Sequence, residues 1–159
     1  MTRVGVTGHR GLPHDTKQLI DHALRNVLEG SNDGHLVGIS CLADGADQLF
    51  ARAVLDLGGH LEVVVPAKQY RDSLDLPGER QTYDQLFAMA SHVVRLPFDE
   101  STEDSHLTAG HHIVDTSDLL IAVWDGQPAR GRGGTADIVT HARELGVPIR
   151  VIWPQGAQR

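Results

Sequence analysis

The sequence predicts an α/β protein, a Rossmann-like three-layer sandwich with a mainly parallel sheet of about six strands. Short runs of β-branched and aliphatic residues alternate along the chain with segments whose apolar residues recur at helical spacing. Several of the short runs are apolar at successive positions, which is typical of strands covered by helices on both faces of a sheet. The chain has 159 residues, a length that fits one domain spanning residues 1–159.

Each expected strand is a short apolar run that is followed by glycine, proline, aspartate or cysteine. In chain order these strands are Arg3–Thr7, Leu36–Ser40, Leu61–Val65, Val93–Leu96, Leu119–Trp124 and Ile149–Trp153. Each expected helix carries apolar residues at the spacing of one buried face. In chain order these helices are Leu19–Leu28, Ala46–Leu57, Tyr83–Ala90, Ser105–Thr116 and Ala136–Leu145, and Ser105–Thr116 has the weakest pattern.

The charge balance bears on the class of partner. With 14 basic and 21 acidic residues the formal net charge is −7, whereas a large nucleic-acid footprint needs a basic face to neutralise phosphates. Nucleic acid is therefore not expected as a partner. A small anionic ligand needs only a few local donors, so a nucleotide-like small molecule remains compatible with this composition.

Cys41 is the only cysteine, which excludes an internal disulfide framework and a cysteine-rich zinc site and fits a reducing cytosol. The first residues lack the apolar core of a signal peptide, and no run approaches the ~20 apolar residues of a membrane span. His111 and Asp115 have ligand-like spacing, but two ligands make a poor metal site. We expect a cytoplasmic protein with no membrane segment, no metal and no cofactor.

The predicted architecture indicates where a ligand would bind. In open parallel sheets, ligands bind beyond the carboxyl ends of the strands, near the point where strand order reverses. Two segments at that edge, Pro66–Gly78 and Pro97–Asp104, are long for a compact domain. They are either lids or ordinary surface loops.

The first candidate loop lies in "VGVTGHRGL" and contains Gly8, His9 and Arg10. Gly8 would allow a sharp exit from the first strand, and Arg10 would present a bidentate donor to a phosphate or carboxylate. The glycine spacing does not match the dinucleotide-binding pattern. The alternative is that Gly8 is a turn residue and Arg10 a solvated charge.

The second candidate loop lies in "SCLADGADQLFA". Asp44 would cap the following helix, and Gly45 would let a ligand approach the exposed backbone N–H groups. Asp44 or Asp47 would accept hydrogen bonds from ribose hydroxyls. The alternative is a helix cap with no ligand.

The third candidate loop is "WDGQPARGRGGTAD", Trp124 to Asp137. Its glycines free the backbone to turn N–H groups inward just before a helix, which is the geometry of an anion site at a helix N-terminus. The alternative is a flexible surface loop. The expected ligand-binding residues here are Asp125, Arg130, Arg132, Gly133, Gly134 and Thr135.

Four segments, "GVTGHRGL", "SCLADGADQLFA", "IAVWDGQPARGRGGTAD" and "VPIRVIWP", resemble the SLOG superfamily of Rossmann-like proteins. The resemblance is nearest to the YpsA-like branch, whose relatives include the Lonely Guy phosphoribohydrolases and the DNA-processing protein DprA, and it spans nearly the whole chain. It implies a nucleotide or nucleotide-derived ligand held by the loops after the first, second and fifth strands. It also implies a homodimer.

The sequence departs from the Lonely Guy pattern P-G-G-x-G-T-x-x-E. Aligning Thr135 with the threonine places Arg132 at the second glycine and Ile138 at the glutamate used to cleave the glycosidic bond. Asp137 is one residue early, and neighbouring helical residues point about 100° apart.

Several carboxylates therefore remain candidates for stabilising the oxocarbenium-like state of base release. They are Asp44, Asp47, Glu79 and Asp137, of which Asp137 is the expected catalytic residue if the protein is a hydrolase. Two functions stay open, a nucleotide sensor or binding protein and a nucleotide N-glycosidase. The resemblance of "SCLADGAD" to a DprA signature adds single-stranded DNA binding as a lesser alternative.

Overall fold

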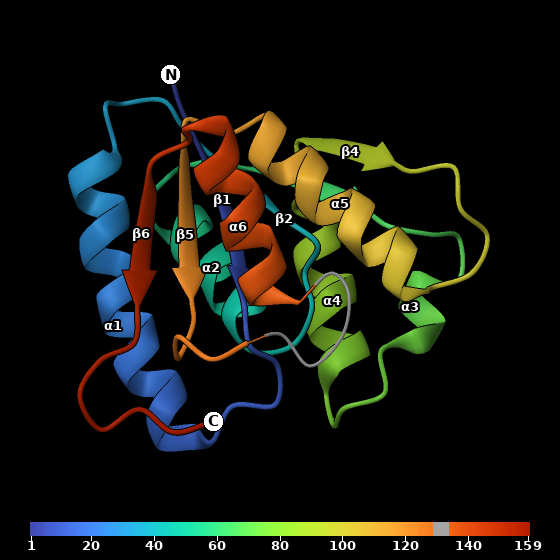
Figure 1. Cartoon of the computed structure of the whole chain (residues 1–159), viewed down its shortest axis with the longest axis horizontal. Coiled ribbons are helices and arrows are strands. Elements are labelled where there is room, and N and C mark those ends of the chain that lie inside the picture. Colours follow the sequence, from blue (N-terminus) through green and yellow to red (C-terminus); the bar gives the residue numbers. More distant parts are fainter. Residues whose placement is uncertain (129–133) are drawn as a thin grey trace.

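The computed structural model describes residues 1–128 and 134–159 (Figure 1). Its six strands form one sheet in the order β4-β3-β2-β1-β5-β6, and every strand pair is parallel. The strands are β1 (Thr2–Gly8), β2 (Leu36–Ser40), β3 (His60–Val65), β4 (His92–Arg95), β5 (Leu119–Val123) and β6 (Ile149–Ile152). The predicted α/β Rossmann-like fold is therefore confirmed, with a sheet that is wholly parallel in the described residues.

The helices alternate with the strands along the chain. They are α1 (His14–Ser31), α2 (Ala46–Asp56), α3 (Tyr70–Ser73), α4 (Glu79–Phe87), α5 (Glu103–Asp115) and α6 (Thr135–Leu145). Three differ most from the sequence prediction. Helix α1 runs from His14 to Ser31, whereas Leu19–Leu28 was expected. The short α3 lies inside a segment expected to be a loop, and α4 begins at Glu79 rather than near Tyr83, because its first turn is polar and hides the start of the helix.

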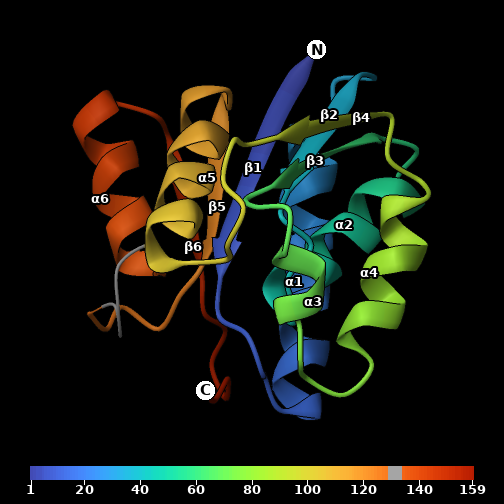
Figure 2. The same cartoon turned by 90° about the vertical axis from the view of Figure 1, so that its right-hand side faces the viewer.

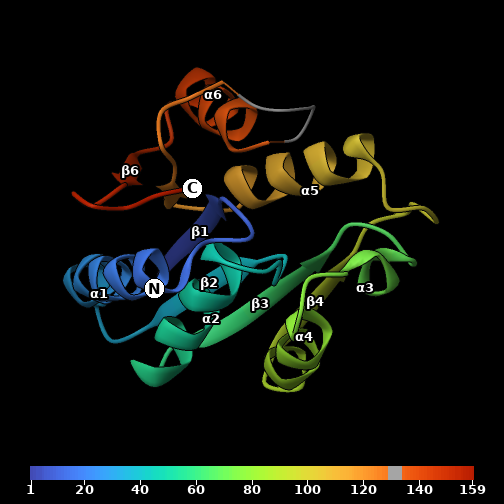
Figure 3. The same ribbon diagram turned by 90° about the horizontal axis from the view of Figure 1, so that it is seen from below.

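The sheet is covered on both faces. Helices α1, α2 and α4 lie on one face, and α5 and α6 lie on the other (Figures 2 and 3). Side chains alternate between the faces along each strand, so Val4 and Val6 of β1 pack in the cluster with α1 and α2. Ile39 of β2 and Leu120 of β5 pack in the cluster with α5 and α6. Among the described residues, no helix is both long and apolar enough to cross a membrane.

The strand order reverses beside β1. The chain runs outward from β1 to β4 and then returns to place β5 on the other side of β1. The helices that follow β1 and β5 therefore lie on opposite faces of the sheet, and the loops that lead to them diverge at the ends of these two strands. Such a switch point is where ligands bind in open α/β sheets.

Candidate functional site

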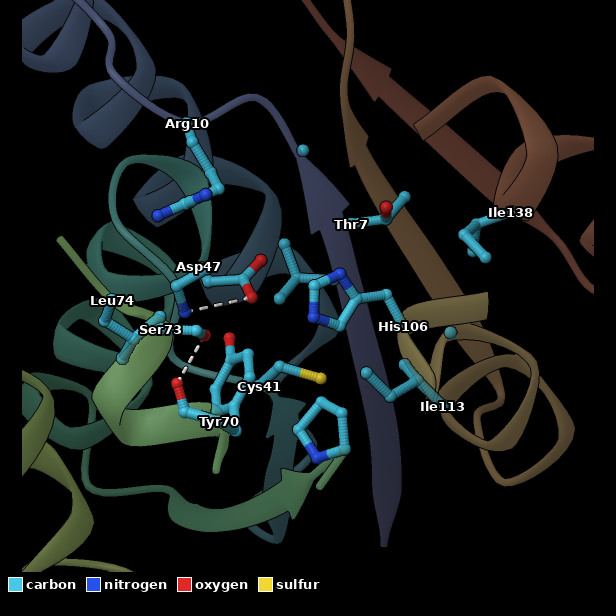
Figure 4. Close-up of a pocket in the computed structure, with 15 residues that line it drawn as sticks. Thr7, Arg10, Cys41, Asp47, Tyr70, Ser73, Leu74, His106, Ile113 and Ile138 are labelled. Atoms are coloured by element: carbon cyan, nitrogen blue, oxygen red, sulfur yellow. Dashed lines mark hydrogen bonds between the residues drawn. The ribbon is translucent and has the colours of Figure 1, made fainter. Parts of the chain in front are cut away.

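A cavity opens at the carboxyl ends of β1, β2 and β3, and α5 contributes His106 and Ile113 to its lining (Figure 4). Its apolar lining comes partly from Leu74, Ile113 and Ile138. Its polar lining comes from Thr7, Arg10, Asp47, Tyr70, Ser73 and His106. The cavity thus joins an apolar wall to a few side chains that can form hydrogen bonds, which is the usual composition of a small-molecule site.

Arg10 is held by an internal carboxylate. Its Nη2 donates to Oε1 and Oε2 of Glu79 at 2.8 and 2.9 Å. The Arg10 side chain is 46% exposed, whereas that of Glu79 has no exposed surface. Arg10 lies at the cavity as predicted. Glu79, a candidate for stabilising a ribosyl cation, does not line the cavity and is committed to partners within the protein.

Asp44 does not cap α2. The residue at the N-cap is Gly45, and no side chain caps the first turn of the helix. Instead, Oδ2 of Asp44 accepts the N–H of Gly11 at 2.9 Å, and Oδ1 lies 3.8 Å from Nζ of Lys17. The φ of 81° at Gly45 separates Asp44 from the helix and leaves its carboxylate facing the loop after β1. The predicted cap is therefore wrong, and this buried carboxylate already has internal partners.

Asp47 lies in the first turn of α2 and lines the cavity (Figure 4). Its Oδ2 accepts the N–H of Ala43 at 3.3 Å. Burial raises the pKa of the Asp47 carboxyl from 3.8 to about 7, because a buried carboxylate loses its hydration. The group therefore gains and loses a proton near neutral pH, inside the cavity.

Two glycines bring the loops after β1 and β2 into direct contact. Gly8 is the last residue of β1, and a Cβ there would collide with Ala46 and Val123. Gly8 therefore allows close packing of β1 against α2 and β5, and the predicted sharp exit from the strand stays a prediction. A Cβ on Gly45 would lie 2.5 Å from the backbone oxygen of His9. That oxygen accepts the N–H of Ala46 at 3.2 Å, so α2 begins directly on the first loop.

His9 and Asp125 connect the loops after β1 and β5. The N–H of Asp125 donates to Nε2 of the buried His9 at 3.1 Å, and Oδ1 of Asp125 lies 3.2 Å from the same nitrogen. The His9 ring meets Trp153 edge-on with ring centres 5.5 Å apart. Neither His9 nor Asp125 lines the cavity. The structure thus gives this pair contacts that hold two loops together at the switch point.

The N-terminus of α6 is described from Gly134 onward. Gly134 is the N-cap residue, and the buried Thr135 begins the helix, as predicted. The predicted ligand residues Arg130, Arg132 and Gly133 lie outside the described residues, so the phosphate cradle stays a prediction.

Two neighbouring residues of α6 differ in their relation to the cavity. Ile138 lines it and is almost fully buried, whereas Asp137 does not line it. The difference fits the rotation of about 100° between successive helical residues. Ile138 is thus the α6 residue at the cavity, and the catalytic role of Asp137 stays a prediction.

Sequence reasoning missed the cavity residues contributed by α3 and α5. Nε2 of His106 on α5 lies 2.8 Å from Oγ of Ser101, and its ring meets that of Tyr70 edge-on at 5.9 Å. Burial lowers the pKa of His106 below 6.5, which favours the neutral ring. The one available signal was the length of Pro66–Gly78, which contains Tyr70 and Ser73.

The fold and the cavity define a doubly wound α/β protein with a cavity at the carboxyl edge of its sheet. No protein-family model matches the sequence, and no curated protein matches it. Among solved structures it is similar to DNA processing protein A (DprA) of Streptococcus pneumoniae, with a TM-score of 0.72 and 19% identity. That match covers 98% of this chain and 52% of the other, so this chain spans about half the length of that protein.

Two further structures have the same fold. DprA of Helicobacter pylori, described as binding single-stranded DNA, matches with a TM-score of 0.69 and 16% identity over 99% of this chain and 68% of that one. A molybdenum cofactor binding protein of Rippkaea orientalis matches with a TM-score of 0.60 and 15% identity over 94% of this chain and 75% of that one.

These neighbours include DprA, one of the groups named by the sequence resemblance, and they confirm the Rossmann-like fold that the resemblance implies. The neighbours do not support the expectation that this protein has no nucleic-acid partner. A protein of the same fold, DprA of Helicobacter pylori, is described as binding single-stranded DNA.

Proposed function

We propose that this protein binds a nucleotide or nucleotide-derived small molecule in the cavity at the carboxyl ends of β1, β2 and β3, as a sensor or binding protein. The observation that carries the proposal is the place of Arg10, a guanidinium held at the polar side of an apolar cavity close to the switch point. Arginine at such a place suits a phosphate group, because its planar fork matches the geometry of phosphate oxygens.

The remaining cavity groups suit the rest of such a ligand. The edge-to-face pair of Tyr70 and His106 offers ring surface to a base, while Thr7, Ser73 and Asp47 offer hydrogen bonds to ribose hydroxyls. The N-terminus of α6, at Gly134 and Thr135, would add backbone donors for a phosphate. The homodimer implied by the resemblance stays a prediction.

A nucleotide N-glycosidase is the competing function. Cleavage needs a carboxylate beside the ribose to stabilise positive charge. Helix α6 presents the aliphatic Ile138 to the cavity, and Asp137 does not line it. Asp47 is the one carboxylate among the described lining residues, and its raised pKa leaves it partly protonated at neutral pH. These observations favour binding over hydrolysis.

Single-stranded DNA binding is favoured by one observation, the likeness to DprA. Such binding usually needs a continuous basic groove with stacking aromatic rings. Among the described arginines, several are paired with carboxylates: Arg3, Arg10, Arg25, Arg71 and Arg159. Together with the acidic balance of the chain, this pairing favours a small ligand.

Titration of the purified protein with a panel of nucleoside monophosphates and ADP-ribose tests the proposal. We expect at least one compound to bind, and Arg10→Ala to weaken its binding about tenfold or more, because a charge-assisted contact to phosphate is lost. Arg10→Lys keeps a charge beside the buried Glu79 and should weaken binding less. The exposed Arg52 on α2 provides a matched control, since Arg52→Ala makes the same change in net charge. Binding that survives Arg10→Ala unchanged would remove Arg10 from the site.

Chromatography of the same mixtures separates binding from hydrolysis. We expect the bound compound to be recovered intact, with little free base released over hours. Robust base release by the wild type that is lost in Asp47→Asn or Asp137→Asn would instead establish the N-glycosidase.

A further inference from the structure

The carboxylate of Glu79 is the centre of a buried hydrogen-bond network next to the cavity. Besides Arg10, the N–H of Asp44 donates to Oε2 at 2.7 Å, and the N–H of Leu76 donates to Oε1 at 3.2 Å. Both oxygens therefore have two donors each. A carboxylate is stable without water only when it is paired and hydrogen-bonded in this way.

The network joins separate segments around the cavity. Arg10 follows β1, Asp44 follows β2, and Leu76 precedes α4. Nε2 of Gln48 on α2 adds a fourth connection, because it donates to the backbone oxygens of Leu42 and Glu79, both at 3.1 Å. The segments that form the polar side of the cavity thus share one buried acidic residue.

The contact also restricts the Arg10 guanidinium. Glu79 is its one hydrogen-bonding partner among the described residues, and a single nitrogen, Nη2, makes both contacts. Nε and Nη1 keep their N–H donors for another acceptor, on a side chain that is 46% exposed at the cavity. An arginine fixed through one nitrogen needs less ordering when it binds an anion through the others.

We propose that Glu79 is a positioning residue for anion recognition: it holds Arg10 so that the remaining guanidinium donors meet a phosphate group of the ligand. This inference rests on the proposed function, and it assigns the phosphate to Arg10 rather than to the α6 N-terminus alone. Glu79 itself does not touch the ligand. Its effect on binding passes through Arg10, which distinguishes positioning from a general contribution to folding.

A double-mutant cycle with AMP as the probe tests this assignment. Glu79→Gln keeps the size of the side chain but replaces one acceptor oxygen by a donor, so Arg10 loses its ionic partner. We expect Glu79→Gln to weaken AMP binding about tenfold. The double variant Arg10→Ala/Glu79→Gln should bind AMP no more weakly than Arg10→Ala, because the two residues act as a unit. Additive losses in the double variant, or wild-type affinity in Glu79→Gln, would overturn the inference.

The chain offers a matched control in Glu62, another buried glutamate paired with an arginine. Its Oε2 accepts from Nη2 of Arg3 at 2.8 Å, and neither residue lines the cavity. Glu62→Gln should leave AMP affinity unchanged. Equal losses in Glu62→Gln and Glu79→Gln would show that stability, not positioning, is responsible.

A measurement without ligand separates this inference from the proposed function. In the ¹⁵N spectrum of arginine side chains, Arg10 should show slowed guanidinium rotation in the wild type and fast rotation in Glu79→Gln. If the wild type shows this restriction but binds no compound of the nucleotide panel, the proposed function fails and the phosphate assignment fails with it. If the wild type binds AMP and Glu79→Gln neither frees Arg10 nor weakens binding, the inference alone fails.

Discussion

Gly45→Ala is expected to lower the free energy of unfolding by roughly 3–5 kcal/mol, the sum of backbone strain and overpacking. Gly45 has φ 81° and ψ −122°, a conformation that side chains with a Cβ rarely adopt. Its Cβ would also lie 2.5 Å from the backbone oxygen of His9. Since that oxygen accepts the N–H of Ala46, the clash would push α2 away from the loop that carries Arg10. Urea denaturation followed by circular dichroism measures the change.

Gly146→Ala provides the control. Gly146 also has a positive φ, 72° with ψ 21°, but nothing lies within 4 Å of a Cβ built there. Its substitution should cost only about 1–2 kcal/mol, the usual penalty of the left-handed region. A Gly45→Ala protein no less stable than Gly146→Ala would show that the contact between α2 and the first loop is looser than described.

Asp47→Asn should change how stability depends on pH. The folded pKa of Asp47 is about 7 and its ordinary value is 3.8, so between these values the folded protein holds a proton that the unfolded chain releases. This group therefore makes the wild type less stable as pH rises, by about 3 kcal/mol between pH 5 and pH 8. Asparagine has the same shape and no charge. The variant lacks this loss, so its stability advantage over the wild type should grow by about 3 kcal/mol between pH 5 and pH 8.

The comparison between variant and wild type is needed because other groups titrate in the same range. Burial lowers the pKa of His106 and of His111, and these groups make the protein more stable as pH rises through about 6.5. Asp99, whose side chain is 78% exposed, serves as a control, and Asp99→Asn should follow the wild-type curve. Parallel curves for Asp47→Asn and the wild type would show that folding does not raise the pKa of Asp47.

The strands were the most predictable part of the molecule. Each is a short apolar run, because helices cover both faces of the sheet, and the observed ends differ from the predicted ends by at most one residue. The short α3 was missed because four residues are too few for a helical period to appear. The start of α4 was missed because its first residue, Glu79, is polar although it is buried. A search for buried apolar residues at helical spacing does not count such a residue.

The sequence predicted the site residues correctly only where a residue's place after a strand puts it at the carboxyl edge of the sheet. Arg10 and Asp47 line the cavity as expected, because both follow strands at the carboxyl edge. Asp44 was assigned to the wrong partner because an aspartate before a helix usually caps it, and its actual partner, Gly11, is distant in sequence. The pairing of Glu79 with Arg10 spans 69 positions, and no local pattern reveals it.

Mass spectrometry of small molecules released by denaturing the purified protein tests the central claim most directly. The claim is that the cavity holds a phosphorylated, nucleotide-derived ligand through Arg10. We expect the wild type to release such a compound, and we expect Arg10→Ala, purified in the same way, to release much less of it. Release of no phosphorylated compound by the wild type, together with no binding of any nucleotide in the panel, would contradict the claim.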